Sequence, residues 1–271
     1  MSDHYKNYQN ISCTLKDTIL WLTLNRPKAK NAIDLLMIEE LCGALKIADF
    51  DNEVRVIVLT GSGDAFCAGG DIKDMENKEG MFAGEPNELK DRYQNGIQNI
   101  PRTIENLKTP IIAMVNGAAI GAGCDLSAMC DLRIVSKNAK FGETFAKLAL
   151  VPGDGGTYFL PRVIGYPKAM EMFLTGKIYN AQEALEMGLA NTICDADELI
   201  EKTNEVATRI ASNSPIAVAM TKKALKKNYL HGLESALDLL AAYQGITQRT
   251  QDHFTGLDAL KNRSQADFKG L

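Results

Sequence analysis

The stretch PIIAMVNGAAIGAGCDL, residues 110–126, decides the fold. Its first half is a continuous apolar run of the kind that forms a buried strand, and the run ends in glycines and alanines. A helix is expected to begin near Gly121, which puts Asp125 in its first turn. A strand, a small-residue loop and a helix in this order indicate one unit of a layered α/β fold.

The same order of elements recurs along the chain. VRVIVLTGSG, residues 54–63, predicts a second buried strand that runs into a glycine loop, and DLRIVS, residues 131–136, predicts a third. CTLKDTILWLTLNRP, residues 13–27, predicts two short strands around a Lys-Asp turn. IDLLMIEELCGALKIAD, residues 33–49, has helical periodicity with Asp34 near its start, whereas MENKEGMFAGEPNE, residues 75–88, predicts a mobile loop.

The character of the chain changes from about Pro167, where successive segments with helical periodicity begin. We therefore expect an α/β core over residues 1–195 and a helical C-terminal region over residues 196–271. The basic run TKKALKKNYL, residues 221–230, lies on one of these helices and is interpreted as a solvated face rather than as a polyanion site.

Composition excludes several classes of protein. The 271 residues carry a net charge of −4 with no basic stripe, so nucleic acid is not an expected partner. No apolar run approaches membrane-spanning length, and MSDHYKNYQN at the N-terminus lacks a signal core, which together predict a cytoplasmic protein without a membrane partner. The six cysteines form no C-x-x-C pair, so no metal site is expected.

Histidine is nearly absent from the sequence. The three histidines are His4, His231 and His253, and none lies in the central part of the chain. Chemistry that needs a central histidine base or metal ligand is therefore disfavoured. Any reaction must depend on carboxyl groups and on backbone N–H donors.

Two glycine loops follow buried strands, TGSGDAFCAGGDIKDM at residues 60–75 and VNGAAIGAGCDL at residues 115–126. Neither contains the third glycine of a dinucleotide-binding loop. Small residues let a ligand approach the backbone closely, and a helix that starts at Gly121 leaves N–H groups unpaired. If the N–H groups of Ala68 and Ala122 point at one spot, they form an oxyanion hole for a carbonyl oxygen that gains charge.

Five motifs together resemble the crotonase superfamily, also called the enoyl-CoA hydratase/isomerase family. They are LNRPKAKNAID, AFCAGGDI, NGAAIGAGCDL, PGDGGTYFLPRVIG and ALEMGLAN, at residues 24–34, 65–72, 116–126, 152–165 and 184–191. The resemblance implies a spiral of repeated ββα units with a C-terminal helical region that drives trimerisation, and trimers that can pair into hexamers. It also implies an acyl-CoA thioester substrate and no cofactor beyond the coenzyme A of that substrate.

The resemblance also assigns site residues. The thioester oxygen would accept the Ala68 and Ala122 N–H groups, and residues 25–29 would lie along coenzyme A, with Lys28 contacting a phosphate. Leu260 and Arg263 match tail positions that complete the coenzyme pocket in some relatives. The expected substrate-binding residues are Lys28, Ala29, Gly69, Asp71, Ile72, Phe145 and Arg263.

The chain departs from the family pattern at the acids. The family's hydratases use two glutamates, and the corresponding positions here hold Asp125 and Phe145. Hydration needs a pair of carboxyl groups to orient water and to move two protons, so the loss of one member disfavours the two-glutamate mechanism. Glu143, two residues before Phe145, is given little weight as a replacement.

Asp154, in LVPGDGGT, is the expected replacement acid. A turn residue or helix cap is the alternative, since aspartate favours both positions. Some superfamily members place a functional aspartate in this loop, so the resemblance favours catalysis. We expect Asp154 to move a proton, Asp125 to assist, and Phe145 to form an apolar wall between them, which would raise the pKa of both acids.

These residues predict an enzyme that forms a thioester enolate, most directly for double-bond or ring isomerisation. Hydration by an altered acid pair is the alternative. Nucleophilic attack by Asp154 on the acyl group is a third possibility, disfavoured because the later water step lacks a central histidine base. A non-catalytic acyl-CoA binder, which Phe145 favours, is the alternative from another class.

Overall fold

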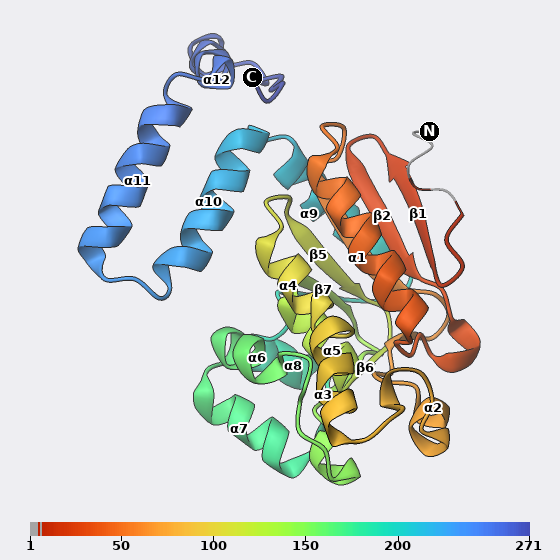
Figure 1. Ribbon diagram of the computed structural model, residues 1–271. Coiled ribbons are helices and arrows are strands. Elements are labelled where there is room, and N and C mark those ends of the chain that lie inside the picture. Colours follow the sequence, from red (N-terminus) through yellow and green to blue (C-terminus); the bar gives the residue numbers. More distant parts are fainter. Residues whose placement is uncertain (1–4, 6) are drawn as a thin grey trace.

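The computed structural model describes residue 5 and residues 7–271, and His4 of the sequence analysis lies outside them. Two β-sheets form the centre of the molecule, helices pack around them, and a helical segment extends from one side (Figure 1). This mixed α/β architecture with parallel sheets and a helical C-terminal region confirms the predicted fold class. Among the described residues, no helix is long and apolar enough to cross a membrane.

The larger sheet has the strand order β1-β2-β3-β5-β7-β10, and the smaller has the order β4-β6-β8-β9. Pairing is parallel except for β1 with β2 and β8 with β9. The strands are β1 Ile11–Lys16, β2 Ile19–Leu24, β3 Val56–Gly61, β4 Ala65–Cys67, β5 Ile111–Val115, β6 Ala118–Ile120, β7 Leu132–Ser136, β8 Lys140–Gly142, β9 Ile178–Asn180 and β10 Thr192–Cys194.

Successive pairs of strands divide between the two sheets. In β3–β4, β5–β6 and β7–β8, the first strand joins the larger sheet and the second joins the smaller one. Helices follow each pair, so the chain winds as a spiral of ββα units. The short second strands place the loop after β4 beside the loop after β6, because β4 and β6 pair in parallel. Both glycine loops of the sequence therefore lie at one edge of the smaller sheet.

The helices fill the space around the sheets. The α-helices are α1 Leu35–Phe50, α2 Ile72–Asn77, α3 Pro86–Asn95, α4 Asn99–Asn106, α5 Ala122–Met129, α6 Gly156–Ile164, α7 Tyr166–Thr175, α8 Ala181–Glu186, α9 Leu199–Ala211, α10 Pro215–Asn228, α11 Leu233–Thr247 and α12 Gln251–Asn262. Short 3-10 turns are η2 Pro27–Ala29, η3 Gly80–Phe82 and η4 Phe145–Leu148. As expected for a helix start, the Asp34 side chain accepts a hydrogen bond from Met37 N at 2.8 Å and caps α1.

The two faces of the larger sheet are covered by different helices. Buried side chains of α1, α4 and α5 form one core with alternate residues of the strands, such as Leu22, Leu59 and Ala113. The opposite face, with Val58 and Ile112, packs against α9. This alternation is what a strand buried on both faces requires.

The predicted mobile loop at residues 75–88 is more ordered than its composition suggested. It contains the end of α2, the turn η3 and the start of α3. Met81 is buried and fixes the middle of the segment, and Glu85 and Glu88 form a capping box at the start of α3. The burial of Met81 and the capping box therefore stabilise regular structure where an irregular loop was expected.

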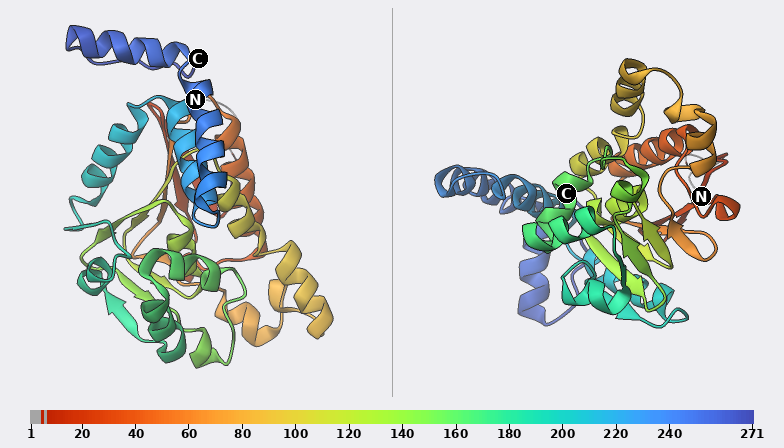
Figure 2. Two further views of the ribbon diagram at one scale, coloured as in Figure 1. Left: turned by 90° about the vertical axis from the view of Figure 1, so that its left-hand side faces the viewer. Right: turned by 90° about the horizontal axis from the view of Figure 1, so that it is seen from below.

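The basic run at residues 221–230 is only partly a solvated face. Lys222 is buried, pairs with Asp131 at 2.6 Å and donates to Thr109 O at 2.8 Å, while Lys226 pairs with Glu105 at 3.3 Å. These contacts attach α10 to the α/β core. Farther along, α11 packs on the outer side of α10, and α12 lies at the opposite end of the molecule from α2 (Figures 1 and 2).

Candidate active site

The segment before α1 is held by a network of charged side chains. Arg26 pairs with Asp34 at 3.2 Å and with Asp71 at 3.0 Å, which joins the first family motif to the second. Asn31, at φ 56°, donates to Ser62 O and Ala65 O, each at 2.9 Å. These bonds fix the turn η2 beside the loop after β4, where the exposed Lys28 side chain is free to meet a ligand.

The Ala68 N–H is not available for an oxyanion hole. It donates to Lys30 O at 3.0 Å, so the expectation for this residue is wrong. At the next residue, Gly69 O accepts from Ile33 N at 2.8 Å. Because C=O and N–H of a trans peptide point in opposite directions, the Gly70 N–H points away from Ile33. Gly70 lies against Met75 and Phe82, so its N–H replaces that of Ala68 as the candidate donor.

The second candidate donor is the N–H of Ala122, the first residue of α5. Gly121 precedes it at φ 53° and donates its own N–H to Gly142 O at 2.8 Å, which fixes the helix start against β8. A Cβ built on Gly69 would lie 3.5 Å from Ala122 N. The two glycine loops therefore meet at the N-terminus of α5, whose first N–H groups lack intrahelical partners.

An apolar cavity of about 490 Å³ adjoins Gly70. It is lined by Ile72, Met75, Glu76, Phe82, Leu89, Tyr93, Leu148 and Leu150. The Tyr93 ring continues from this cavity to Gly153, where a Cβ would lie 2.7 Å from the ring. A hydrophobic space of this size beside candidate oxyanion donors is suited to an acyl chain.

Three buried carboxyl groups lie together beneath the loops. Asp125 and Glu143 have no exposed surface, and Asp154 is 3% exposed. Asp125, in the first turn of α5, faces both Asp154 and Glu143. Gly156 makes room for this arrangement, because a Cβ there would overlap the Asp125 carboxyl. Within the described part of the chain, none of the six carboxyl oxygens accepts a hydrogen bond from an N–H or a hydroxyl.

Burial is the main cause that raises the pKa of all three acids. For Asp125, neighbouring Asp154 and Glu143 raise the pKa further, well above its ordinary value. For Glu143, burial raises the pKa to about 8, although contacts with Cys124 and Asp125 oppose the shift. For Asp154, burial raises the pKa against the opposing contact with Asp125. Three buried carboxyls this close cannot all be ionised, so near neutral pH the cluster shares protons.

The alternative role of Asp154 as a helix cap does not fit the structure. The N-cap of α6 is Gly155, no side chain caps that helix, and the Asp154 oxygens have no N–H donor. Burial raises the pKa of Tyr93 and of Cys67, and nearby Asp154 raises the pKa of both groups further. Asp154 therefore lies near Tyr93, which lines the apolar cavity, and near Cys67, the last residue of β4.

Phe145 covers the start of α5 from the other side. A Cβ on Gly121 would lie 3.7 Å and 3.8 Å from two atoms of the Phe145 ring. The ring thus forms an apolar wall at the start of α5. It does not separate Asp125 from Asp154, so that part of the expectation is wrong, because the two carboxyls face one another directly. Asp71 is engaged differently, since it pairs with Arg26 and caps α2 through Lys73 N at 3.1 Å.

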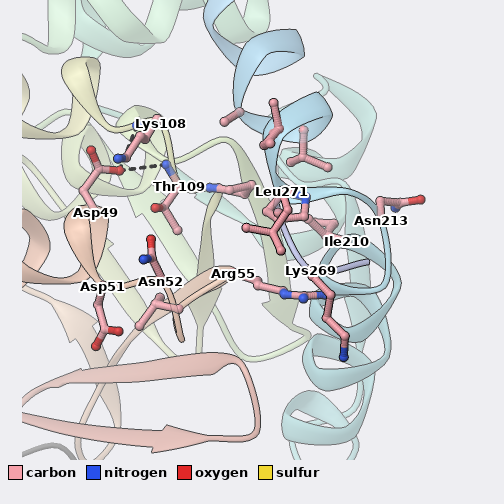
Figure 3. A pocket seen from close by; sticks show the side chains of 17 residues that line it. Asp49, Asp51, Asn52, Arg55, Lys108, Thr109, Ile210, Asn213, Lys269 and Leu271 are labelled. Atoms are coloured by element: carbon pink, nitrogen blue, oxygen red, sulfur yellow. Dashed lines mark hydrogen bonds between the residues drawn. The ribbon is translucent and has the colours of Figure 1, made fainter. Parts of the chain in front are cut away.

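Arg263 is not brought to this site within a single chain. It ends α12, on the far side of the molecule from α2 and η2 (Figures 1 and 2). Near that end lies a separate cavity of about 280 Å³ (Figure 3), which Arg55, Lys108 and Leu271 help to line. None of the three clustered carboxyls lines this second cavity.

Three parts of the candidate site were not predicted from the sequence, namely Gly70, Tyr93 and the full involvement of Glu143. The pairing of Ala68 N–H with Lys30 O depends on a contact across the chain and leaves no local signal. Glu143 offered one signal, its position directly after a strand that ends beside the glycine loop. The direction of the Glu143 side chain could not be predicted, because the alternation of side chains along a strand and their spacing on a helix hold only inside those elements, and Glu143 follows the last residue of β8.

Comparison with known proteins shows which family the chain resembles. The family model described as "Enoyl-CoA hydratase/isomerase" matches residues 14–271. A crotonyl-CoA hydratase of Syntrophomonas wolfei is 36% identical over 96% of this chain and 98% of its own length. A mitochondrial enoyl-CoA hydratase of Pongo abelii is 38% identical over 93% of this chain and 84% of its own.

A solved structure of similar fold is the enoyl-CoA hydratase of Bacillus anthracis. It is 35% identical, has a TM-score of 0.91, and the match covers 97% of this chain and 100% of that one. The family match over nearly the whole sequence, the identities to these relatives and the ββα spiral lead to one conclusion. The chain belongs to the enoyl-CoA hydratase/isomerase family of the crotonase superfamily.

Proposed function

We propose that this protein binds an acyl-CoA thioester and moves a proton on the acyl group through a thioester enolate. The Gly70 and Ala122 N–H groups hold the enolate oxygen, and the acyl chain occupies the cavity beside Phe82 and Tyr93. Two preorganised donors stabilise the charge that develops on that oxygen. Lys28 and Ala29, on the fixed turn η2, contact the coenzyme A portion.

Asp154 carries the proton, and Asp125 shares it. The observation that supports this assignment is the buried carboxyl cluster, whose oxygens have no N–H or hydroxyl partner among the described residues. Burial raises the pKa of Asp154, which brings a carboxyl group closer to the pH at which it can both accept and return a proton.

Isomerisation of a double bond fits this arrangement best. A single acid that removes a proton at one carbon and returns it at another suffices for that reaction, whereas hydration also requires an oriented water. Phe145 presents an apolar ring where a second acid would hold that water. We therefore expect an acyl group bound in the cavity next to the Phe145 ring to be isomerised rather than hydrated.

Hydration is the second candidate, and the relatives favour it. The crotonyl-CoA hydratase of Syntrophomonas wolfei and the short-chain-enoyl-CoA hydratase of Clostridium acetobutylicum are 36% and 34% identical to this chain. If hydration occurs, Asp125 and Asp154 form the carboxyl pair that handles the water. The acids then differ from a two-glutamate arrangement in both position and length.

One assay separates the two reactions. The purified protein is incubated with crotonyl-CoA and with a 3-enoyl-CoA while the absorbance of the conjugated enoyl thioester is followed. Isomerisation predicts a rise in that absorbance from the 3-enoyl-CoA and little loss from crotonyl-CoA. A rapid loss from crotonyl-CoA with no rise from the 3-enoyl-CoA would establish hydration and overturn the first candidate.

The variant Phe145→Glu sharpens this test. It places an acid opposite Asp125 at the oxyanion loop, so hydration of crotonyl-CoA should increase relative to the unchanged protein. Asn106→Glu on the exposed end of α4 is a control for the added charge. A folded Phe145→Glu protein with neither new hydration nor altered isomerisation would show that Phe145 does not border the reacting atoms.

Association into trimers or hexamers is part of the proposal. Large apolar side chains remain exposed on α11 and α12, among them Leu233, Leu237, Leu240 and Leu260. An exposed apolar surface of this kind supports contact with another copy of the chain. Sedimentation equilibrium measures the assembly directly, and a monomer at micromolar concentration would contradict it.

A further inference from the structure

We propose that Glu143 is the innermost member of a three-carboxyl proton relay, where it positions the Asp125 hydrogen toward Asp154. The inference rests on the proposed function, because Asp154 is taken as the group that exchanges a proton with the substrate. Glu143 is thus a positioning residue that acts through Asp125.

The backbone places Glu143 directly beside Asp125. Glu143 follows β8, and the last residue of that strand, Gly142, accepts the Gly121 N–H at 2.8 Å. This bond holds the end of β8 against the first turn of α5, which carries Cys124 and Asp125. The Glu143 side chain enters the space between the strand end and the helix, where it is completely buried.

The surroundings of Glu143 do not suit an ordinary structural carboxylate. The titratable groups that face it are Cys124 and Asp125 of α5 and Asp154 of the loop before α6. A buried carboxylate normally requires a cation or several N–H donors. Neither Glu143 oxygen has an N–H or hydroxyl donor in the described residues, so its burial favours the protonated form, bonded to another carboxyl, below about pH 8.

The order of the three acids defines the relay. Asp125 faces both other carboxyls, whereas Glu143 acts on Asp154 only across a longer distance. With one negative charge in the cluster, the Glu143 hydroxyl donates to Asp125, and the Asp125 hydroxyl donates to the Asp154 carboxylate. A bond between a carboxyl and a carboxylate is of the strong, charge-assisted kind. The charge therefore lies on the acid nearest the acyl cavity.

The proton transfer balances within this arrangement. Asp154 removes a hydrogen from the acyl group, the C–H bond breaks, its electron pair enters the enolate, and an O–H bond forms on Asp154. All three carboxyls are then neutral. The reverse step returns a hydrogen to carbon and restores the negative charge on Asp154. Throughout both steps the Glu143 hydrogen stays in place and keeps the Asp125 hydroxyl directed outward.

Ionisation of Glu143 would reverse this direction. A Glu143 carboxylate would draw the Asp125 hydroxyl inward, and Asp154 would lose its donor. Activity should therefore decline as the pH rises through the range in which Glu143 loses its proton. Glutamine at this position keeps a permanent N–H donor of the same size, whereas leucine keeps the volume and removes the donor.

The test compares Glu143→Gln and Glu143→Leu with the unchanged protein, using Glu186→Gln on the exposed face of α8 as the control for the chemical change. In Glu143→Gln the alkaline decline of kcat should move to higher pH by about one unit or more. In Glu143→Leu, kcat should fall about 10- to 100-fold while KM changes less, since the donor that keeps the Asp125 hydroxyl directed at Asp154 is lost. An unmoved alkaline decline in Glu143→Gln would overturn the relay, even if leucine fails to fold.

A second measurement does not depend on turnover. Infrared difference spectra between pH 6 and pH 9 report carboxyl groups that lose a proton over that range. The unchanged protein and Glu186→Gln should show the loss of a buried protonated carboxyl, and Glu143→Gln should lack that signal. The infrared signal could be present in the unchanged protein and absent from Glu143→Gln while neither acyl-CoA substrate reacts. That result would contradict the proposed function but support the proton-sharing cluster. Identical spectra for Glu143→Gln and the unchanged protein would remove Glu143 from the cluster.

Discussion

Two parts of the molecule bury aspartate in opposite ways. Asp252, in the first turn of α12, is 2% exposed and accepts hydrogen bonds from Ser214 Oγ at 2.7 Å, Lys269 N at 2.8 Å and Gly270 N at 3.1 Å. Asp154 is 3% exposed and has no such donor. Equal burial therefore accompanies two different surroundings. N–H and hydroxyl donors satisfy the Asp252 oxygens, whereas burial without such donors raises the pKa of Asp154.

The difference identifies which acid has a structural role. Asp252 ties the last residues of the chain to α12 and to the start of α10, and its oxygens are fully used. In the described part of the chain, the oxygens of Asp154, Asp125 and Glu143 have no N–H or hydroxyl donor, and they face one another and the Cys124 thiol. Unsatisfied buried acids are costly to a fold, so their presence as a group beside a cavity indicates chemistry rather than stability.

The largest effect is expected when Asp154, the acid without donors, is replaced. Asp154→Asn keeps the size of the side chain but removes the exchangeable carboxyl proton, so turnover of the reactive acyl-CoA should fall by roughly 10²–10⁴-fold. Affinity for coenzyme A and the melting temperature should change little. Asp252→Asn is the matched control. A loss of turnover per folded molecule in both variants would contradict the assignment of a structural role to Asp252 and a catalytic role to Asp154.

The next effect concerns the oxyanion donors. Ala122→Pro removes one N–H at the first position of α5, where proline is well tolerated, and turnover should fall by about 10²–10³-fold. Steady-state kinetics and circular dichroism separate this loss from unfolding. Ala181→Pro makes the same change at the first position of α8, outside the site. Near-normal turnover in a folded Ala122→Pro protein would exclude this donor.

A smaller effect is expected on stability at the other buried acid. Asp252→Asn replaces one oxygen with an NH₂ group, which cannot accept the Lys269 or Gly270 N–H. The free energy of unfolding should fall by about 1–3 kcal/mol. Urea unfolding measures it, with Asp154→Asn as the reference that should show no comparable loss. Equal losses in the two variants would mean that the donors around Asp252 contribute nothing.

The smallest effect, for a change of one pH unit, is the response of the cluster to pH. Because the pKa of Glu143 is raised from about 4.3 in the unfolded chain to about 8 in the fold, the native state keeps a proton that the unfolded chain releases. Its stabilising contribution is full below about pH 4 and declines as the pH rises to about 8, by at most about 1.4 kcal/mol per pH unit. Glu143→Gln should therefore gain stability relative to the unchanged protein between pH 5 and pH 8 in urea unfolding. A constant difference over that range would show that Glu143 does not titrate there.

Much of the fold could be predicted from the sequence because the long strands and helices carry their own periodic patterns. The paired strands at residues 13–27 and the helix capped by Asp34 are examples. The strands β4, β6 and β8 could not, since three residues are too few for a period to appear. These short strands are the elements that bring the two glycine loops together.

The parts of the site that could be predicted are the residues that occupy positions in the family motifs. Asp125, Asp154 and Phe145 follow from the family motifs, and the structure places all three around the start of α5. Gly70 could not be chosen over Ala68, because that choice depends on which N–H a distant carbonyl already uses. Glu143 could not be weighed, because its importance comes from burial without donors, a property of the packed fold.

The burial of the carboxyl cluster determines how its hydrogen atoms exchange with the substrate and with the solvent. None of its six oxygens is open to solvent, so hydrogens held there are exchanged with bulk water only when the site opens. A hydrogen taken from an acyl chain joins the few already present, and the one returned need not be the same atom. An isotope in the substrate would then be diluted by a small internal pool rather than by the solvent, and its distribution in the product would record how many hydrogens Asp154 and Asp125 share.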